Sequence, residues 1–268
     1  MSTAEPPVEH RARQGADFFV KGHELTEQIE RVEADAAGPL SPTDHLLDRA
    51  PWESLTGPHA RFALRYGRAA RYDPDVAPFI ALEDHRDPRA WEDVAALLGP
   101  DEKLTLAGVT EWPDDWKPEF SAEGVQMVAT SVDPRPEPEA VLLGPDDVPE
   151  ILDLVARTEP GPFRPRTIEL GDYLGVRRDG ALVAMAGERL HPPGWTEISA
   201  VCTDAAYRGQ GLASRLVRAV AAGIVARGER PFLHALATNT NAIRLYRSLG
   251  FELRLTRPFN VLARKATQ

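Results

Sequence analysis

A glycine-rich turn between an apolar segment and a helical pattern is the part of the chain that most directly suggests chemistry. The turn holds Arg208, Gly209, Gln210 and Gly211 and follows the apolar residues 196–203. Glycines allow the backbone to approach a ligand closely, and the first amides of a helix have no acceptor within the helix. Together with the positive end of the helix dipole, these amides favour an anion. The turn therefore predicts a binding site for a phosphate or pyrophosphate.

The elements that must position this turn predict a mixed α/β fold. Helices are expected at residues 146–158, 212–227 and 240–249, and strands at residues 173–176, 181–189, 196–203, 232–237, 251–255 and 259–263. Apolar residues recur on one face of each expected helix. Asp179 and Gly180 lie between two apolar segments, a pattern typical of a hairpin. This order of elements indicates a mixed sheet with helices over its faces.

The rest of the chain divides into three further parts. Residues 1–40 are polar and are expected to form a mobile arm or an appended helix. Residues 41–132 predict a smaller α/β region, with strands at 78–82, 104–109 and 125–130 and a helix at 87–98. Residues 133–140 alternate proline with charge and predict a linker. The second domain is then expected over residues 141–268.

Charge is unevenly distributed along the 268 residues. Residues 1–140 carry 14 Lys and Arg against 28 Asp and Glu, a balance of −14, whereas residues 141–268 carry 17 against 13, a balance of +4. An acidic first half argues against nucleic acid as a partner, because such binding depends on neutralising phosphates with Lys and Arg. No apolar run approaches the length of a membrane span, and the first residues lack the features of a signal peptide. We therefore expect a cytoplasmic protein that binds neither membranes nor nucleic acid.

The cysteine and histidine content predicts no metal site. The single cysteine, Cys202, lies in an apolar segment, where a core position is expected, and one cysteine can form neither a cysteine-cluster site nor an intrachain disulfide. The histidines of the first half show no metal-ligand spacing, and we expect them to be exposed or to cap helices. They are His10, His23, His45, His59 and His85.

Two motifs within residues 146–266 resemble the GNAT superfamily of acetyl-CoA-dependent N-acetyltransferases. Residues 208–213, Arg-Gly-Gln-Gly-Leu-Ala, fit the family's phosphate-loop pattern of Arg or Gln, two residues, Gly, one residue, and Gly or Ala. Residues 239–251 fit a second family signature, in which Asn is followed by Ala, by Leu-Tyr and then by Leu-Gly-Phe. The resemblance implies an α/β (α+β) fold with a mixed, mostly antiparallel sheet and flanking helices, preceded here by the smaller α/β region.

The resemblance also implies where acetyl-CoA binds. Backbone groups of the strand before the turn are expected to pair with the pantetheine arm, and the amides of residues 209–214 are expected to hold the pyrophosphate. Asn239 is expected to lie against acetyl-CoA, whereas Asn241 suits a helix cap. The complete expected set is Val201, Cys202, Thr203, Arg208, Gly209, Gln210, Gly211, Leu212, Ala213, Ser214, Asn239 and Tyr246.

Three residues are candidates for proton transfer. The resemblance makes the phenol of Tyr246 the general acid that protonates the departing CoA thiolate, a task that suits a phenol with a pKa of about 10. The attacking ammonium must first lose a proton, so a base is also needed. Glu197 precedes the phosphate loop on its strand, and His234 lies on the next strand. Either residue is a candidate base, and the two could share the site.

The sequence thus predicts an N-acetyltransferase that transfers an acetyl group from acetyl-CoA to a primary amine by direct attack in a ternary complex. The alternative is a CoA-binding regulatory or sensor module without transfer activity. Residues 41–132 lack an Arg-x-x-Gly-x-Gly/Ala segment, so they could form only a degenerate copy of the same fold without a second acetyl-CoA site. The protein is expected to act as a monomer or homodimer.

Overall fold

The computed structural model describes residues 42–99 and 101–265. The chain divides into two compact units, Met1–Asp44 and His45–Gln268, and the fold described here is that of the second unit. The arm or helix expected within residues 1–40 lies outside the described residues.

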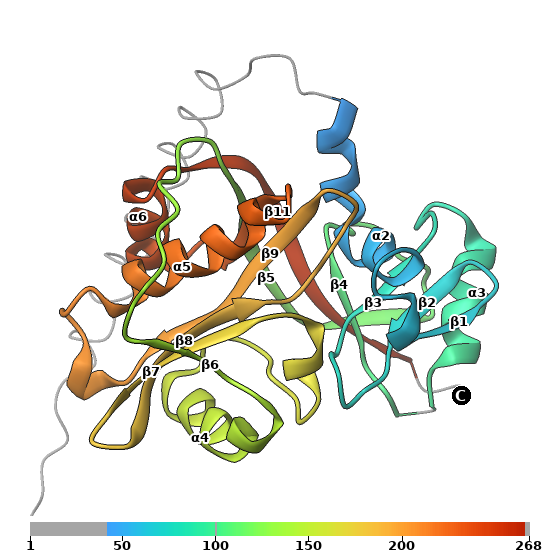
Figure 1. Ribbon diagram of the computed structural model, residues 1–268. Coiled ribbons are helices and arrows are strands. Elements are labelled where there is room, and N and C mark those ends of the chain that lie inside the picture. The colour runs from blue at the N-terminus through green and yellow to red at the C-terminus, as the bar shows by residue number, and fades with distance from the viewer. Residues whose placement is uncertain (1–41, 100, 266–268) are drawn as a thin grey trace, which may run out of the picture. The chain divides into compact units, whose positions relative to one another are not determined.

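An eight-stranded sheet forms the centre of the fold (Figure 1). Its strand order is β4-β11-β5-β10-β9-β8-β7-β6, and all neighbouring strands are antiparallel except β9 and β10. The strands are β4 (Leu104–Ala107), β5 (Trp116–Ala129), β6 (Ala140–Leu142), β7 (Tyr173–Arg178), β8 (Ala181–Glu188), β9 (Trp195–Thr203), β10 (Arg230–Leu236) and β11 (Phe251–Arg264). The sheet confirms the mixed, mostly antiparallel architecture expected from the sequence.

Helices α5 (Leu212–Ala226) and α6 (Thr240–Ser248) lie on one side of this sheet (Figure 1). Apolar side chains recur along α5 at helical spacing and form a buried stripe, because that face packs on the sheet. The stripe includes Leu212, Leu216, Val217, Val220 and Ile224. It shares a core cluster with Ile198 of β9 and Leu233 of β10. The strands that carry the candidate site are therefore fixed from this side by α5.

The opposite side of the sheet is covered by two groups of elements. Helix α4 (Val148–Thr158) packs on β8 and β9. Helix α2 (Ala50–Thr56) and a three-stranded antiparallel sheet pack near Trp195 of β9 and Phe232 of β10. The small sheet consists of β1 (Ala63–Tyr66), β2 (Ala69–Tyr72) and β3 (Ile80–Leu82).

Helix α3 (Pro88–Leu97) and short 3-10 helices complete the described fold. Helix α3, expected at residues 87–98, begins after Asp87, whose side chain accepts a hydrogen bond from the Arg89 amide, and it has proline in its first turn. Its Trp91 contacts Trp116 of β5. The 3-10 helices are η1 (Pro42–Arg49), η2 (Ala60–Phe62), η3 (Pro145–Asp147), η4 (Thr167–Leu170) and η5 (Ala205–Tyr207).

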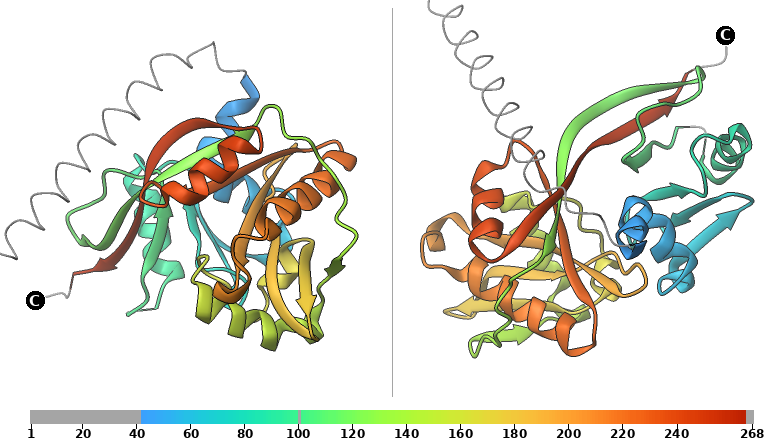
Figure 2. Two further views of the ribbon diagram at one scale, coloured as in Figure 1. Left: turned by 90° about the vertical axis from the view of Figure 1, so that its left-hand side faces the viewer. Right: turned by 90° about the horizontal axis from the view of Figure 1, so that it is seen from above.

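The expected linker at residues 133–140 is not a domain boundary, which corrects the domain division made from the sequence. Strand β5, which precedes this segment, lies between β11 and β10 in the middle of the large sheet (Figure 2). Its backbone groups pair with strands from the C-terminal half, so neither half can keep its ladder without the other. Glu137 also forms an ion pair with Arg215 of α5. Within the described residues, 45–132 therefore complete the large sheet and add a small one, and do not form a separate copy of the fold.

Two local features show where sequence patterns determined the fold and where they did not. Asp179 and Gly180 both have positive φ values, 51° and 84°, so the predicted hairpin turn between β7 and β8 is confirmed. The two closing strands expected at 251–255 and 259–263 are instead the single strand β11. Strand β11 continues through Pro258, which lies opposite Glu123 in regular register with β5. The irregularities in this pairing lie between Leu253 and Leu255 and between Val261 and Leu262.

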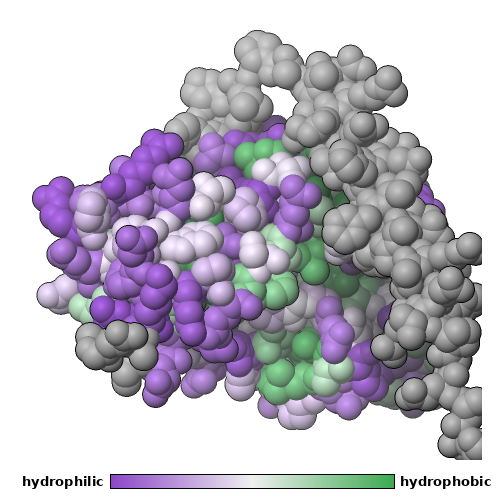
Figure 3. Space-filling view, turned by 180° about the vertical axis from the view of Figure 1, so that it is seen from behind, coloured by the Kyte–Doolittle hydropathy of each residue, from purple (hydrophilic) through white to green (hydrophobic). Residues whose placement is uncertain are grey.

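Seen from behind, hydrophilic residues dominate one side of the described surface, and hydrophobic residues gather toward the other side (Figure 3). Within the described ranges, no helix combines the length and the apolar character needed to cross a membrane.

Candidate active site

The two parallel strands of the large sheet separate toward their C-terminal ends. Their paired residues run from Trp195 opposite Arg230 to Ile198 opposite Leu233, although β9 continues for five residues beyond this point. Ala200 of β9 has a positive φ of 54°, next to an irregularity in the pairing of β9 with β8. The backbone edge of β9 beyond residue 198 is therefore not paired with β10, and its polar groups can pair with an extended ligand.

A cavity of about 380 Å³ opens at this strand separation. It is lined by the end of α4, the end of β9, the glycine-rich turn, the first part of α5 and one side of α6. Its residues include Val201, Cys202, Thr203, Arg208, Gly209, Gly211, Leu212, Ala213, Ser214, Asn239 and Tyr246. These are all of the residues expected to contact acetyl-CoA except Gln210. The fold thus brings together two signatures that lie about thirty residues apart in the sequence.

The start of α5 supplies the anion-binding end of the cavity. Gly209 and Gly211 have φ values of 79° and 74°, a left-handed conformation that glycine adopts without strain. A Cβ atom at either position would meet no heavy atom within 4 Å, so the turn is open rather than packed. No side chain caps the helix. Its first amides are therefore available to an anion, and the helix dipole adds to their attraction.

Asn239, and not Asn241, caps helix α6. The Oδ1 atom of Asn239 accepts a hydrogen bond of 3.1 Å from the backbone N–H of Ala242. Asn241 already lies within the helix, and its Oδ1 accepts from Arg244 at 3.4 Å. Asn239 therefore combines capping with a place in the cavity wall, and its amide nitrogen is the group left to donate to a ligand.

Tyr246 contributes a protonated phenol to the cavity. It lies on α6, is 7 % exposed, and packs edge-on against Phe251. Burial raises the pKa of Tyr246 to about 12, with a smaller contribution from Cys202. The phenol therefore keeps its proton at neutral pH. Cys202 is buried, as expected, and burial raises the pKa of its thiol, so this thiol is not an activated nucleophile.

Glu197 and His234 contact each other on the face of the sheet opposite α5. His234 Nδ1 lies 2.7 Å from Glu197 Oε1, and Arg189 donates to both carboxylate oxygens at 2.6 and 2.9 Å. Burial alone would raise the pKa of Glu197, but the charge and hydrogen bonds of Arg189 and the His234 N–H outweigh it and hold that pKa below its usual range. Glu197 is therefore an ionised partner of two donors, which makes it a poor proton acceptor.

His234 lies at the apex of the strand separation. It follows Leu233, the last residue of β10 that pairs with β9, and its side chain is 6 % exposed. Burial lowers the pKa of His234, an effect that Glu197 opposes, so the imidazole is neutral at neutral pH. Neither His234 nor Glu197 lines the 380 Å³ cavity. The geometry thus places these two candidates together, beside the cavity rather than in its wall.

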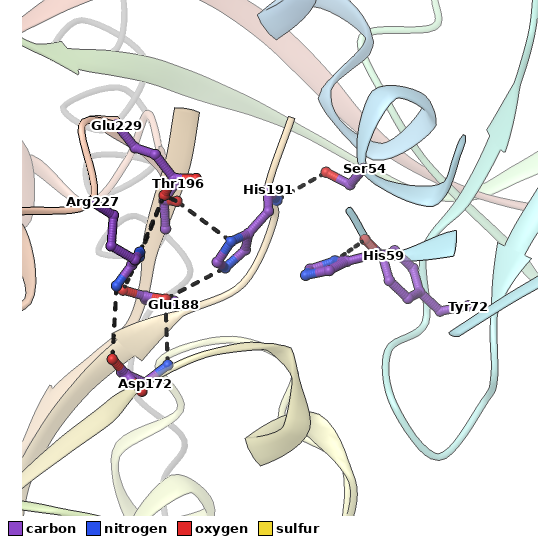
Figure 4. A network of polar contacts seen from close by, with 9 residues as sticks. All are labelled: Ser54, His59, Tyr72, Asp172, Glu188, His191, Thr196, Arg227 and Glu229. Carbon is purple, nitrogen blue, oxygen red and sulfur yellow. Dashed lines mark hydrogen bonds and ion pairs between the residues drawn. The ribbon is translucent and has the colours of Figure 1, made fainter. Parts of the chain in front are cut away.

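A second polar cluster lies near the other ends of β9 and β10 and corrects an expectation about the first-half histidines (Figure 4). His59 is 3 % exposed rather than solvent-exposed. Its Nδ1 lies 2.9 Å from the hydroxyl of Tyr72, and its ring centroid is 4.8 Å from that of His191. The His191 backbone N–H donates to Ser54 Oγ at 2.9 Å. His59 is thus buried because α2 and the small sheet pack against the large sheet.

The imidazole of His191, which packs against that of His59, also lies beside charged side chains. Its Nε2 lies 3.5 Å from a carboxylate oxygen of Glu188, which also accepts from Arg227 at 2.7 Å. Burial lowers the pKa of His59 to about 3 and that of His191 to about 4, and neighbouring charges add to both shifts. Within the described ranges, no group of three or more His, Cys, Asp and Glu side chains is placed to hold a metal ion.

Sequence reasoning missed the residues that surround His234. Arg189 follows β8 and faces Glu197 across the turn between β8 and β9. Gln126 of β5 contacts the imidazole from the other side, and Arg254 of β11 contacts Gln126. Gln126 is a polar residue between Val125 and Met127, and this was its only signal. The pairing of β5 with β10 could not be inferred from local patterns, so the contact remained hidden.

The arrangement of the sheet, the separated parallel strands and the glycine-rich helix start define the class of fold found in acetyltransferases, and comparison with known proteins identifies the family. The family model of FR47-like proteins matches residues 173–259. A crystal structure of a protein assigned to the GNAT acetyltransferases, from Novosphingobium aromaticivorans, is 42 % identical and has a TM-score of 0.76. The match covers 83 % of this chain and 100 % of that one. The chain therefore belongs to the GNAT family.

Two further relatives extend these similarities. The N-alpha-acetyltransferase RimI of Mycobacterium tuberculosis is 40 % identical over 83 residues, which are 30 % of this chain and 51 % of that protein. The chain thus matches about half the length of this curated relative. A GCN5-related N-acetyltransferase from Kribbella flavida shares the fold, with a TM-score of 0.55 and 16 % identity over 82 % of this chain and 95 % of its own.

Proposed function

We propose that this protein transfers an acetyl group from acetyl-CoA to a primary amine by direct attack in a ternary complex. The observation that carries the proposal is the cavity of about 380 Å³ at the separation of β9 and β10, which both signatures line. The free edge of β9 suits the amides of a pantetheine arm, and the uncapped start of α5 suits a pyrophosphate. Membership of the family supports acetyl-CoA as the donor.

In this proposal Tyr246 is the general acid. Its phenol is protonated at neutral pH, because burial raises its pKa to about 12, and it lines the cavity. It therefore has a proton to donate when the carbon–sulfur bond of the thioester breaks and a thiolate forms beside it. Positioned proton donors of this kind contribute about 10²–10⁴-fold to rates.

His234 fits the role of base better than Glu197 does. The proton that the ammonium loses must reach an unprotonated acceptor atom, and burial keeps the imidazole of His234 neutral, with one ring nitrogen unprotonated. The carboxylate of Glu197 is already used by Arg189 and by His234 Nδ1. We assign Glu197 to holding the imidazole, with Nδ1 as the donor and Nε2 as the proton-accepting atom.

Calorimetry with acetyl-CoA followed by a free-thiol assay tests the function. The amine panel begins with peptides bearing a free α-amino group, because the relative from Mycobacterium tuberculosis is an N-alpha-acetyltransferase, and continues with amino acids, small amines and aminoglycosides. We expect binding of acetyl-CoA and amine-dependent release of thiol. Binding without thiol release from any amine would instead support the alternative of a CoA-binding regulatory module, and absence of binding would contradict both.

A further inference from the structure

The hydrogen bonds around Gln126 specify which nitrogen of His234 carries the proton. Gln126 lies on β5, directly opposite His234 on β10, and is fully buried. Its side-chain oxygen accepts from Arg254 Nη1 at 2.7 Å. Arginine has donors only, so the atom it contacts must be the amide oxygen and not the amide nitrogen. The orientation of the Gln126 amide follows from this one contact.

The nitrogen of the same amide then faces two other groups. Gln126 Nε2 lies 3.0 Å from the backbone oxygen of Leu47 and 3.0 Å from His234 Nε2. The carbonyl oxygen of Leu47 is an acceptor, which agrees with the orientation set by Arg254. An amide nitrogen is itself only a donor, so His234 Nε2 must be the acceptor and carry no proton. The single proton of the neutral imidazole is therefore on Nδ1, where it is donated to Glu197 at 2.7 Å.

The segment that precedes the large sheet holds this arrangement in place. Asp48 of η1 accepts from Arg254 Nη1 at 2.8 Å and also pairs with Arg257. The side chains of Arg254 and Arg257 are 4 % and 8 % exposed, so Asp48 fixes guanidinium groups that have little access to water. Leu47 and Asp48 are adjacent in η1. This short segment thus secures both ends of the Gln126 amide, one directly and one through Arg254.

The charges that surround the imidazole act on its pKa in both directions. Within the described residues, two carboxylates and three guanidinium groups reach this region from four elements or their ends. These groups are Glu197 of β9, Asp48 of η1, Arg189 after β8, and Arg254 and Arg257 of β11. Burial keeps the ring neutral, although Glu197 favours a second proton on it, and the guanidinium groups of Arg257 and Arg189 disfavour that proton.

We propose that Gln126, held by Arg254 and Asp48 and by the Leu47 carbonyl, is a positioning residue that keeps His234 as the Nδ1–H tautomer with its basic lone pair on Nε2. This inference rests on the proposed function in assigning the lone pair to the acceptor's proton. The amide donates to that lone pair until the acceptor amine, directly or through water, replaces it. The residues before the large sheet thereby acquire a role in the reaction, because they orient the amide that orients the base.

Nitrogen NMR of the full-length protein labelled in its histidine side chains tests the tautomer without any assay of activity. With no acetyl-CoA or amine present, we expect Nδ1 of His234 to resonate as a protonated nitrogen and Nε2 as an unprotonated one at neutral pH. The His234→Gln variant assigns the signals. A protonated Nε2 in the wild-type protein would overturn the inference, whatever the activity of the protein.

The Gln126→Glu variant tests the donor directly, and Gln126→Leu is its control. A carboxylate at this position accepts from Nε2, so we expect it to stabilise the imidazolium. The midpoint of the His234 pH titration followed by NMR should then rise by about one pH unit or more, which is at least a tenfold gain in proton affinity. Gln126→Leu removes the donor without adding an acceptor and should raise the midpoint less. Equal midpoints in wild type and Gln126→Glu would contradict the role of the donor.

The same variants separate this inference from the proposed function. If His234 is the base, the acid limb of the pH profile of kcat/KM should move to higher pH in Gln126→Glu, together with the midpoint of the His234 titration measured by NMR. The KM for acetyl-CoA should change little. A shifted midpoint without a shifted acid limb would contradict the assignment of His234 as base and leave the tautomer assignment intact. Absence of thiol release in the wild type would count against the transfer reaction only, since the NMR outcome still decides the tautomer.

Discussion

Tyr246 and Tyr207 both line the cavity, yet only Tyr246 belongs to the second signature. Tyr246 is 7 % exposed and holds its proton at neutral pH, because burial raises its pKa to about 12. Because both side chains line one cavity, the two phenols can be compared directly by the same substitution to phenylalanine.

We expect Tyr246→Phe to lower kcat by about 10²-fold or more while the Kd for acetyl-CoA changes little, because the hydroxyl acts on the thiolate that forms only as the reaction proceeds. Tyr207→Phe should leave kcat within a few-fold of wild type. Steady-state thiol release and calorimetry measure the two quantities. A Tyr246→Phe variant with wild-type turnover on a good acceptor would rule out the general-acid role.

The pair of Glu197 and Arg189 makes a stability prediction at the same scale. The two side chains are 0 % and 14 % exposed, so removing the carboxylate charge leaves a guanidinium largely buried without its partner. We expect Glu197→Gln to lower the free energy of unfolding by about 3 kcal/mol. Asp153→Asn is the control, because it removes half of an exposed pair with Arg157, and it should cost less than about 1 kcal/mol.

Urea denaturation measures both variants, and a double variant isolates the pair. Arg189→Met combined with Glu197→Gln removes the unpaired charge, so part of the lost stability should return. A Glu197→Gln variant as stable as Asp153→Asn would contradict the buried pair. Glu197→Gln should also lower turnover more than acetyl-CoA affinity, because Glu197 holds His234 and does not line the cavity.

At the scale of elements, substitutions of the glycines at the two ends of α5 separate the effect of backbone strain from the effect on acetyl-CoA binding. Gly209 before α5 and Gly228 after it both have φ of 79°, and a Cβ at either position would meet open space. An alanine at either site must adopt the left-handed region, which costs about 1–2 kcal/mol. Of the two, only Gly209 lines the 380 Å³ cavity.

Gly209→Ala and Gly228→Ala should therefore destabilise the fold by similar amounts but affect binding differently. We expect roughly a tenfold or greater loss of acetyl-CoA affinity in Gly209→Ala, because its Cβ keeps the pyrophosphate away from the backbone amides. Gly228→Ala should retain the wild-type Kd. Thermal unfolding and calorimetry of the two variants provide the test. Equal affinities would place the pyrophosphate elsewhere.

The sequence predicted elements well where the signal is local. The Asp179-Gly180 turn, the amphipathic stripe of α5 and the glycines before it depend on residues within a few positions of each other, and each was found where expected. The sequence pattern was insufficient where the pairing of distant strands determines the extent of an element. Two closing strands were expected at residues 251–255 and 259–263, but β11 is continuous, because the long β5 supplies a partner along almost its whole length. Which of two asparagines caps α6 also depended on where the helix begins.

At the scale of the whole molecule, local composition was misleading. The prolines and charges of residues 133–140 are typical of a linker, yet β5 before this segment and β6 after it belong to one sheet. Contacts between β5 and β10 join residues more than one hundred positions apart, and no periodicity encodes them. For the same reason the sequence placed Glu197 and His234 near one site but could not find Gln126, which determines how His234 is protonated.

The burial of His59 and His191 between the first half and the large sheet predicts an acid-sensitive fold. Their pKa values, about 3 and about 4, lie below the ordinary value of 6.5 because burial disfavours the charged ring. Below pH 6.5 the unfolded chain binds protons that the folded protein does not, so stability falls as pH decreases toward 4. Each histidine contributes a slope of about 1.4 kcal/mol per pH unit in this window. Glu188, whose pKa is raised by burial, opposes part of this slope in its lower range.

A substitution isolates the histidine contribution from every other titrating group. His191→Gln removes up to one proton from the difference between unfolded and folded states, so the average slope of unfolding free energy against pH between 6.5 and 5 should decrease by about 1 kcal/mol per pH unit. His85→Gln is the matched substitution outside the cluster, and its slope is measured beside that of His191→Gln. Urea titrations at a series of pH values measure these slopes. If His191→Gln and wild type have the same slope, His191 is not held neutral in the folded protein.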